Sequence, residues 1–236
     1  MDLVTIALAK GRLLPEALAL LKKAGLVREN EEYREDSRQL IFDQEDASLR
    51  LILARPSDVP VYVEHGAADL GITGKDVLLE EGPAVIELLD LGISPCHFAL
   101  AVPAEKAASF PPTLGRLKIA TKFPRVTENY LSRKRLAAEI IHLRGAVELA
   151  PRVGLAQAIL DLVATGQTLR ENGLVEVERV ADSTARLIAN EASFLLKKDR
   201  LENVVAAIDR VRSPEMKIAT TTFVSADSAQ GATFKR

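Results

Sequence analysis

Short apolar runs alternate with helical patterns along the chain, which predicts stacked layers of strands and helices. Leu3–Leu8 is typical of a buried strand, and Leu13–Ala24 follows with helical spacing up to Gly25, which ends the helix. Two β-type runs, Gln39–Phe42 and Leu49–Ala54, flank a polar turn and predict a hairpin. We therefore expect an α/β fold with mainly parallel sheets.

The rest of the chain continues this alternation. Strands are expected at Asp69–Ile72, Val85–Leu91, Phe98–Val102, Leu117–Thr121, Glu139–His142, Ile159–Ala164, Leu174–Val180 and Ala185–Ala189. Helices are expected at Pro56–His65, Thr127–Ala137, Pro151–Ala158 and Lys197–Val211. Gly92–Pro95 predicts a first crossing between two lobes, and the chain is expected to return near Ser183–Asn190. One lobe would hold residues 1–92 and 187–236, and the other residues 93–186.

Composition and charge narrow the class of protein. The chain has 236 residues, of which 47% are hydrophobic and 27% charged, as is ordinary for a soluble globular protein. A net charge of −2 argues against non-specific nucleic-acid binding, which needs a basic face. The single cysteine excludes a disulfide framework, and the three histidines lack metal-ligand spacing, so no protein metal site is predicted. With no long apolar run and an acidic start, we expect no membrane span, no secretory signal and a cytoplasmic location.

The most informative segment is Glu148–Leu169. A buried apolar strand there carries one acid, Asp161, which is costly to bury without a partner. The turn that follows is rich in backbone donors, and such a turn at a helix N-terminus binds anions. Gly166 lets a phosphate approach the backbone, and Thr165 and Thr168 add hydroxyls. An acid beside a phosphate cradle suits ribose hydroxyls, so the segment indicates a sugar-phosphate site; alternatively, the threonines only cap the helix.

This segment resembles the signature of the ATP phosphoribosyltransferases, the first enzymes of histidine biosynthesis. The matching positions are Glu148, Gly154, Ala156, Ile159, Asp161, Leu162, Thr165, Gly166, Thr168 and Leu169. The resemblance implies that the phosphate and ribose of phosphoribosyl pyrophosphate bind to Asp161, Ala164, Thr165, Gly166, Gln167 and Thr168. It extends over residues 3–211, through blocks at Ala9–Leu13, Ser37–Phe42, Ala54–Glu80, Ala120–Leu131 and Ser183–Phe194.

The resemblance also implies a fold and a reaction. The fold would be two α/β lobes like a type II periplasmic binding protein, with the active site in the cleft between the lobes. In the reaction, N1 of ATP attacks C1 of phosphoribosyl pyrophosphate, giving phosphoribosyl-ATP and pyrophosphate. Mg²⁺ would bridge the oxygens of the pyrophosphate group.

A further implication concerns assembly. The residues after Ser213 are too few for the histidine-binding domain of the family's long form, so the chain resembles the short catalytic form. Such forms pair as homodimers and work in a hetero-octamer with a regulatory subunit that resembles histidyl-tRNA synthetase.

Basic residues in the first lobe are candidates for binding the substrate phosphates. Lys10, Arg12, Arg38 and Arg55 each follow a predicted strand or lie in a turn, and Arg offers bidentate geometry to phosphate. The resemblance implies catalytic contacts for Lys10, Arg38 and Arg55, and substrate contacts for Gly11 and Arg12. Without the resemblance, solvated surface charges would be the ordinary interpretation.

A second block of the first lobe is expected to line the nucleotide side of the cleft. By resemblance, this role falls to Asp69, Leu70, Gly71 and Thr73.

Other polar residues have more than one interpretation. Lys122 and Arg125 precede a predicted helix and could either reach phosphate or lie on the surface. Cys96 and His97 are adjacent but point to opposite faces of a strand, so we expect packing rather than a nucleophilic pair.

Two rival functions remain open at this stage. One is a two-lobe small-molecule binding module without catalysis, because the same architecture serves receptors and regulators. The other is a phosphoribosyltransferase with a different acceptor base. A ribose-phosphate cradle favours an enzyme, and competition by ATP against other bases would separate the two enzymes.

Overall fold

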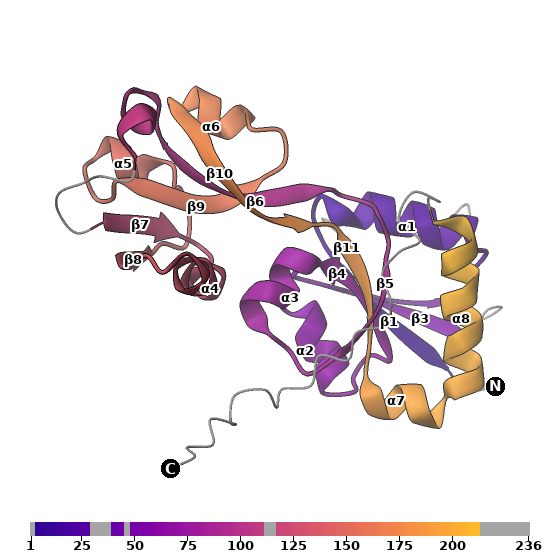
Figure 1. The fold of residues 1–236 in the computed structure, drawn as a ribbon. Helices are drawn as coiled ribbons and strands as arrows, with labels where there is room; N and C mark the ends of the chain where they lie inside the picture. Colours follow the sequence, from indigo (N-terminus) through magenta and orange to yellow (C-terminus); the bar gives the residue numbers. More distant parts are fainter. Residues whose placement is uncertain (1–2, 29–38, 45–47, 111–116, 213–236) are drawn as a thin grey trace, which may run out of the picture. The chain divides into compact units, whose positions relative to one another are not determined.

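The computed structural model describes residues 3–28, 39–44, 48–110 and 117–212 (Figure 1). The chain divides into two compact units. The first contains the residues up to 78, residues 82–94 and those from 184 on, and the second contains residues 79–81 and 95–183. The crossings at 94/95 and 183/184 compare with the expected 92/93 and 186/187. Residues 79–81, which lie within the predicted first lobe, belong to the second unit.

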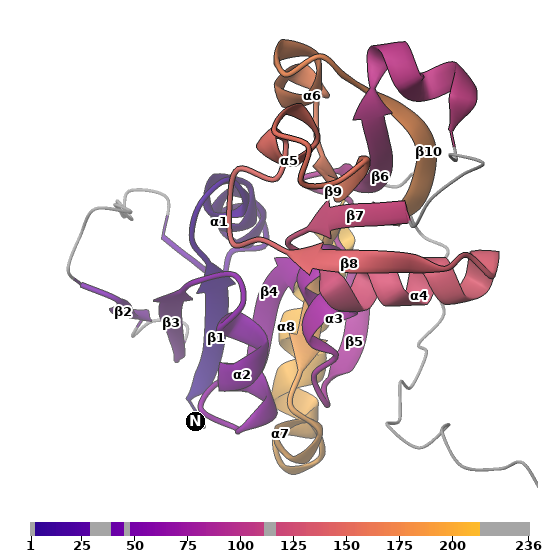
Figure 2. The same ribbon diagram turned by 90° about the vertical axis from the view of Figure 1, so that its left-hand side faces the viewer.

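The first unit is built on a sheet whose central strand is parallel to both of its neighbours (Figure 2). In sheet order the strands are β2 (Ile41–Gln44), β3 (Leu49–Ala54), β1 (Val4–Ala9), β4 (Leu70–Gly74), β11 (Ala185–Ala189) and β5 (Ile86–Asp90). β2 is antiparallel to β3, as the predicted hairpin requires, and β11 is antiparallel to both β4 and β5.

Helices cover both faces of this sheet. α1 (Leu13–Lys23) and α8 (Lys198–Val211) pack against the large side chains of β1, β3 and β4. α2 (Val59–Glu64) packs on the other face, where the strands present mainly alanine. The remaining helices are α3 (Lys75–Glu81) and α7 (Glu191–Leu196). Alternating large and small side chains along β1 therefore give the sheet one thick and one thin apolar layer.

The second unit has a sheet of its own. In order its strands are β10 (Leu174–Ser183), β6 (Cys96–Pro103), β9 (Ala158–Val163), β7 (Leu117–Thr121) and β8 (Ala138–His142). β7 is parallel to β8 and β9, whereas β6 is antiparallel to β9 and β10. α4 (Pro124–Lys134) covers one face, and α5 (Leu149–Arg152) and α6 (Gln167–Glu171) cover the other. A 3₁₀ helix, η2 (Ala104–Ser109), follows β6.

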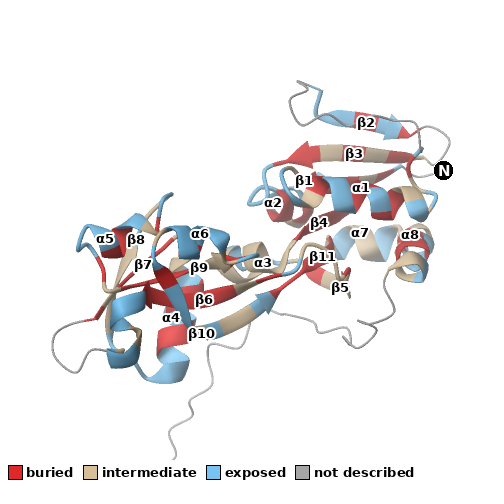
Figure 3. Cartoon of the chain, turned by 90° about the horizontal axis from the view of Figure 1, so that it is seen from above, coloured by how far each residue is buried: buried red, intermediate tan, exposed pale blue. Residues whose placement is uncertain are grey.

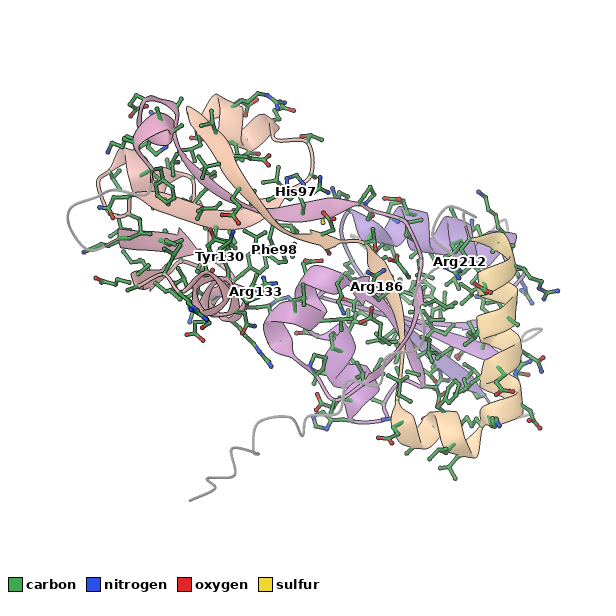
Figure 4. The ribbon with its side chains drawn as sticks, viewed as in Figure 1. His97, Phe98, Tyr130, Arg133, Arg186 and Arg212 are labelled. Atoms are coloured by element: carbon green, nitrogen blue, oxygen red, sulfur yellow. The ribbon has the colours of Figure 1, made fainter. Side chains whose placement is uncertain are left out.

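Buried residues run along the central strands of both sheets (Figure 3). In the second unit, Phe98 on β6 and Tyr130 on α4 belong to one apolar cluster (Figure 4). The Tyr130 hydroxyl donates a hydrogen bond to Glu178 on β10 at 2.8 Å. Burial, followed by this carboxylate, raises the pKa of Tyr130, so the hydroxyl stays protonated and holds α4 to the sheet.

The structure corrects several sequence predictions. The sheets are mixed rather than mainly parallel, because the strands that carry the chain between the units, β6, β10 and β11, run against their neighbours. The helix expected at Pro151–Ala158 is wrong: α5 ends at Arg152, and Gly154 turns the chain with a left-handed φ of 73°. α2 begins only at Val59, and α3 and α7 were missed. None of the described helices has the length and apolar character of a membrane span.

Both sheets share one topological feature that predicts where a ligand binds. After β1, the chain places β3 on one side of it and β4 on the other. After β7, it likewise places β8 on one side and β9 on the other. In open α/β sheets, ligands bind outside the carboxyl ends of strands where the order reverses in this way. Each unit therefore has one candidate edge.

Candidate functional site

The second unit has a pocket of about 420 Å³ at the carboxyl ends of β7 and β9. Its walls are the turn after β7, the end of β9 and the loop into α6. The polar lining residues are Lys122, Glu148, Asp161, Thr165, Gln167 and Thr168. All six residues predicted to bind phosphoribosyl pyrophosphate line the pocket: Asp161, Ala164, Thr165, Gly166, Gln167 and Thr168.

A buried threonine fixes the turn after β7. Thr121 donates its hydroxyl to the carbonyl of Leu160 at 2.7 Å, and the same Oγ1 accepts from the backbone N–H of Phe123 at 2.9 Å. Thr121 and Leu160 are also partners in the parallel pairing of β7 and β9. The next residue, Lys122, consequently projects toward Asp161, with 4.0 Å between its Nζ and Oδ2.

Asp161 is the acid that the sequence placed in a buried strand, and its side chain is 18% exposed. Its Oδ1 accepts a hydrogen bond from the N–H of Leu162 at 2.9 Å. Burial raises the pKa of Asp161, the Leu162 N–H and the Lys122 cation act in the opposite direction, and Glu148 adds a smaller upward effect. The carboxylate therefore lies in the pocket with capacity to accept hydrogen bonds from ligand hydroxyls.

The loop from β9 into α6 supplies backbone donors. Gly166 has a left-handed φ of 70°, and a Cβ at this position would lie 3.0 Å from Nη1 of Arg170. The same Nη1 donates to the carbonyl of Thr165 at 3.1 Å, which braces the loop from outside the pocket. Since the first N–H groups of a helix have no partner within it, the start of α6 offers donors to an anion. The hydroxyl of Thr165 accepts a long hydrogen bond of 3.4 Å from the N–H of Gln167, and the N-cap residue of α6 is Gly166 rather than a threonine.

The edge of the first unit is different in chemistry. Lys10 follows β1 and Arg55 follows β3, and the preceding residues Ala9 and Ala54 are paired in the sheet. The N–H of Lys10 also donates to the carbonyl of Ala54 at 2.8 Å. The structure thus brings the predicted cations Lys10 and Arg55 together at one carboxyl edge. Gly11 adjoins them with a left-handed φ of 87°.

Thr73 reaches the same edge near the end of β4, but it is fully buried, and its hydroxyl donates to the carbonyl of Pro56 at 3.3 Å. Arg12 is the N-cap residue of α1, and its Nη2 donates to the carbonyl of Ser94 at 3.2 Å. Arg38 lies outside the described residues.

Asp69, Leu70 and Gly71 are not brought to this edge. Asp69 precedes β4, at the opposite end of the sheet, and its Oδ2 accepts from the N–H of Thr5 at 2.9 Å. The same oxygen is 3.0 Å from Nζ of Lys197. At about 3.3 Å per residue, Lys10 lies about 16 Å further along the strand than Thr5.

The two residues after Asp69 are equally structural in their contacts. Leu70 is fully buried in the core of the first unit. A Cβ on Gly71 would lie 2.7 Å from Val63 on α2, so the glycine permits close packing of that helix. The nucleotide-binding role expected for this block therefore has no support from the geometry of these three residues.

Other polar residues were missed or left open. Glu148 matches the predicted signature and lines the pocket, although it was not assigned a site role. Arg125, which could have reached phosphate, does not line the pocket, and its Nη1 donates to the carbonyl of Glu81 at 3.0 Å. Cys96 is buried, as expected, and His97 has a different partner, with 2.8 Å between its Nε2 and Oε2 of Glu176.

Comparison with known proteins identifies the family. Residues 55–210 match the family model described as HisG: ATP phosphoribosyltransferase. The chain is 46% identical over 211 residues to the ATP phosphoribosyltransferase of Caldanaerobacter subterraneus subsp. tengcongensis, covering 89% of this chain and 98% of that protein. It is 49% identical over 210 residues to the ATP phosphoribosyltransferase of Bacillus subtilis, covering 89% and 95%.

Solved structures agree with this result. A chain of the ATP phosphoribosyl transferase (HisG:HisZ) complex from Thermotoga maritima has a TM-score of 0.74 and 32% identity, covering 88% of this chain and 97% of that one. The alkanesulfonate-binding protein SsuA from Xanthomonas axonopodis has a TM-score of 0.51 at 13% identity, covering 89% and 73%, which shows only the shared two-lobe fold. The chain therefore belongs to the ATP phosphoribosyltransferase family, whose reaction is the first step of histidine biosynthesis.

Proposed function

We propose that the pocket of the second unit binds phosphoribosyl pyrophosphate and that the edge of the first unit binds ATP. In the second unit, Asp161 accepts hydrogen bonds from the ribose hydroxyls. The 5′-phosphate lies on the loop Ala164–Thr168, where the backbone N–H groups at the start of α6 and the threonine hydroxyls donate to it. This arrangement is supported by one observation above all: a half-buried carboxylate and a glycine-containing hydroxyl loop line the same pocket.

In the first unit, Lys10 and Arg55 bind the triphosphate of ATP. Two fixed cations at the carboxyl edge suit a polyanion, and Arg adds bidentate contacts. In the transfer, a bond forms between adenine N1 and C1 of the ribose while the bond from C1 to the pyrophosphate oxygen breaks. Charge develops on the ribose ring and on the leaving group, so positioning and electrostatic stabilisation supply the catalysis. The adenine lone pair needs no general base.

Mg²⁺ would travel with the substrate. Within the described ranges no group of three or more His, Cys, Asp or Glu side chains could hold a metal ion. Glu148 and Asp161 are the carboxylates that line the pocket, and oxygen donors of this kind suit Mg²⁺. When bound, Mg²⁺ would neutralise charge on the departing pyrophosphate.

The assay that tests this proposal measures phosphoribosyl-ATP formed from ATP and phosphoribosyl pyrophosphate with Mg²⁺. The chain is assayed alone and with its regulatory partner. Formation of phosphoribosyl-ATP supports the proposal. If no other nucleotide can take the place of ATP as the acceptor, the chain is also distinguished from a transferase with another acceptor base. A folded chain that binds both ligands without turnover in either preparation would instead indicate a binding module.

We also propose that the chain pairs as a homodimer and joins a hetero-octamer with a regulatory subunit resembling histidyl-tRNA synthetase, in the cytoplasm. This assembly is supported by the similarity to one chain of the HisG:HisZ complex, because the match covers 97% of that chain. Co-purification followed by light scattering tests this assembly, and a monomer in the presence of the partner would contradict it.

A further inference from the structure

The last turn of α3 belongs to the second unit, although the helix begins at Lys75 in the first. Leu79 packs against the apolar cluster that contains Phe98. Glu80 accepts two backbone hydrogen bonds from α4, at 3.1 Å from the N–H of Arg125 and at 3.0 Å from that of Val126. The carboxylate of Glu80 therefore lies at the start of α4.

α4 lacks a cap of its own. Its N-cap residue, Phe123, makes no side-chain capping hydrogen bond, and its first residue, Pro124, has no N–H to donate. The first two donors of the helix are thus those of Arg125 and Val126, and Glu80 accepts from both. A carboxylate at this place is favoured by the hydrogen bonds and by the helix dipole.

The turn that Glu80 holds is the one that lines the pocket. Lys122 and Phe123 lie between β7, where the Thr121 hydroxyl fixes the N–H of Phe123, and the capped start of α4. The ring of Phe123 packs edge-on against Phe98, with 4.9 Å between the ring centroids. Lys122 is therefore fixed on both sides along the chain, by Thr121 before it and by Glu80 after it.

We infer that Glu80 is a positioning residue for the phosphoribosyl pyrophosphate pocket, acting through the start of α4 on Lys122 and Phe123. The inference rests on the proposed function, because it takes the ligand of the pocket to be phosphoribosyl pyrophosphate. Glu80 is not among the residues that line the pocket, so it acts without touching the ligand. It keeps the Lys122 cation beside Asp161 at the rim where the negative charge of the ligand lies.

Binding of phosphoribosyl pyrophosphate with Mg²⁺ to the full chain, measured by titration calorimetry, tests the inference. Glu80→Gln removes the charge and leaves one acceptor oxygen for the two N–H groups, so one capping hydrogen bond is lost and the Kd should rise about tenfold, the size of a lost cap. Glu81→Gln is the matched control. It removes the same charge from the next residue along the chain, whose side chain is exposed. The Kd of this control should stay at the wild-type value.

Two further measurements separate positioning from general destabilisation. The Kd for ATP should be unchanged in Glu80→Gln, since Lys10 and Arg55 are untouched. Amide exchange at Arg125 and Val126 should accelerate in Glu80→Gln and not in Glu81→Gln. Equal Kd values for the two variants, or parallel losses for both ligands, would overturn the inference. A wild-type chain that fails to bind phosphoribosyl pyrophosphate would overturn the proposed function and the inference with it.

Discussion

The two units share one arrangement of strands but carry different side chains at the corresponding edge of the sheet. Each has a central strand flanked by parallel neighbours, and each ends at an edge where polar residues gather. In the first unit that edge carries the cations Lys10 and Arg55. In the second it carries a carboxylate, a single lysine and a loop of hydroxyls and backbone donors.

This difference teaches what each edge can recognise. Fixed cations bind negative charge wherever it lies on a flexible polyphosphate, with little demand on the rest of the ligand. A half-buried carboxylate beside a loop of backbone and hydroxyl donors would favour a ligand with hydroxyls and a phosphate at a set separation, which is the pattern of a sugar phosphate. The second edge is therefore the selective one.

The largest effect should come from Asp161→Asn. The amide keeps the shape of the side chain but loses the charge, so kcat/KM should fall by roughly 10²–10³-fold. Steady-state assays measure this loss. Asp182→Asn, at an exposed acid in the same unit, should leave the rate near the wild-type value. A small loss in Asp161→Asn would remove the main chemical contrast between the two edges.

Lys10→Ala and Arg55→Ala should each raise the KM for ATP by roughly tenfold to a hundredfold, as expected for a lost charged hydrogen bond. The KM for phosphoribosyl pyrophosphate should change little, because that ligand is proposed to bind the other edge. Lys198→Ala is the control, since this lysine is an exposed residue of α8. If the two KM values rise together, the assignment of one substrate to each edge is wrong.

Gly71→Ala should destabilise the first unit where α2 packs on the sheet. The new Cβ would lie 2.7 Å from Val63, and overpacking of this kind lowers the free energy of unfolding by about 1–3 kcal/mol. Thermal unfolding measures the change. Gly145→Ala, where a Cβ meets nothing within 4 Å, provides the comparison. Equal melting temperatures in the two variants would contradict the close packing of α2.

The smallest effect concerns stability and pH. Burial raises the pKa of Asp161 in the folded state, so the folded protein binds this proton more tightly than the unfolded chain does. Ionisation at this position therefore costs stability above the folded pKa. Asp161→Asn should melt at a higher temperature than wild type at pH 7 while losing activity. The gain should shrink as the pH falls below the folded pKa; a gain that grows toward acid pH would show the opposite shift.

Local patterns predicted the regular parts of the fold. The hairpin of β2 and β3, helix α1 and strand β7 follow from residue periodicity, and the structure confirms them. The mixed direction of the sheets could not be predicted, because strand direction depends on pairings between segments far apart in the chain. The short helix α3 has no buried residue in its pattern and left no periodic signal.

In the site, too, the residues that lie in one contiguous motif could be predicted, whereas those that depend on distant partners could not. The loop into α6 and Asp161 are contiguous in sequence, so one motif revealed them, and the pocket contains them. Asp69 and Arg12 carried an equally polar signal, yet their partners Lys197 and Ser94 are remote in sequence. Side chains used for internal contacts resemble ligand-binding ones until those distant partners are known.

The shared helix α3 has a consequence for how the protein can be divided and how it folds. A fragment of residues 95–183, cut where the chain crosses between the units, would lose Leu79 from its core and the cap on α4. We therefore expect this fragment to be less stable than the same unit in the whole chain, and a circular permutant that keeps α3 joined to it to recover the loss. During synthesis, Glu80 leaves the ribosome before the helix that it caps. Completion of the second unit therefore draws on a segment already made as part of the first.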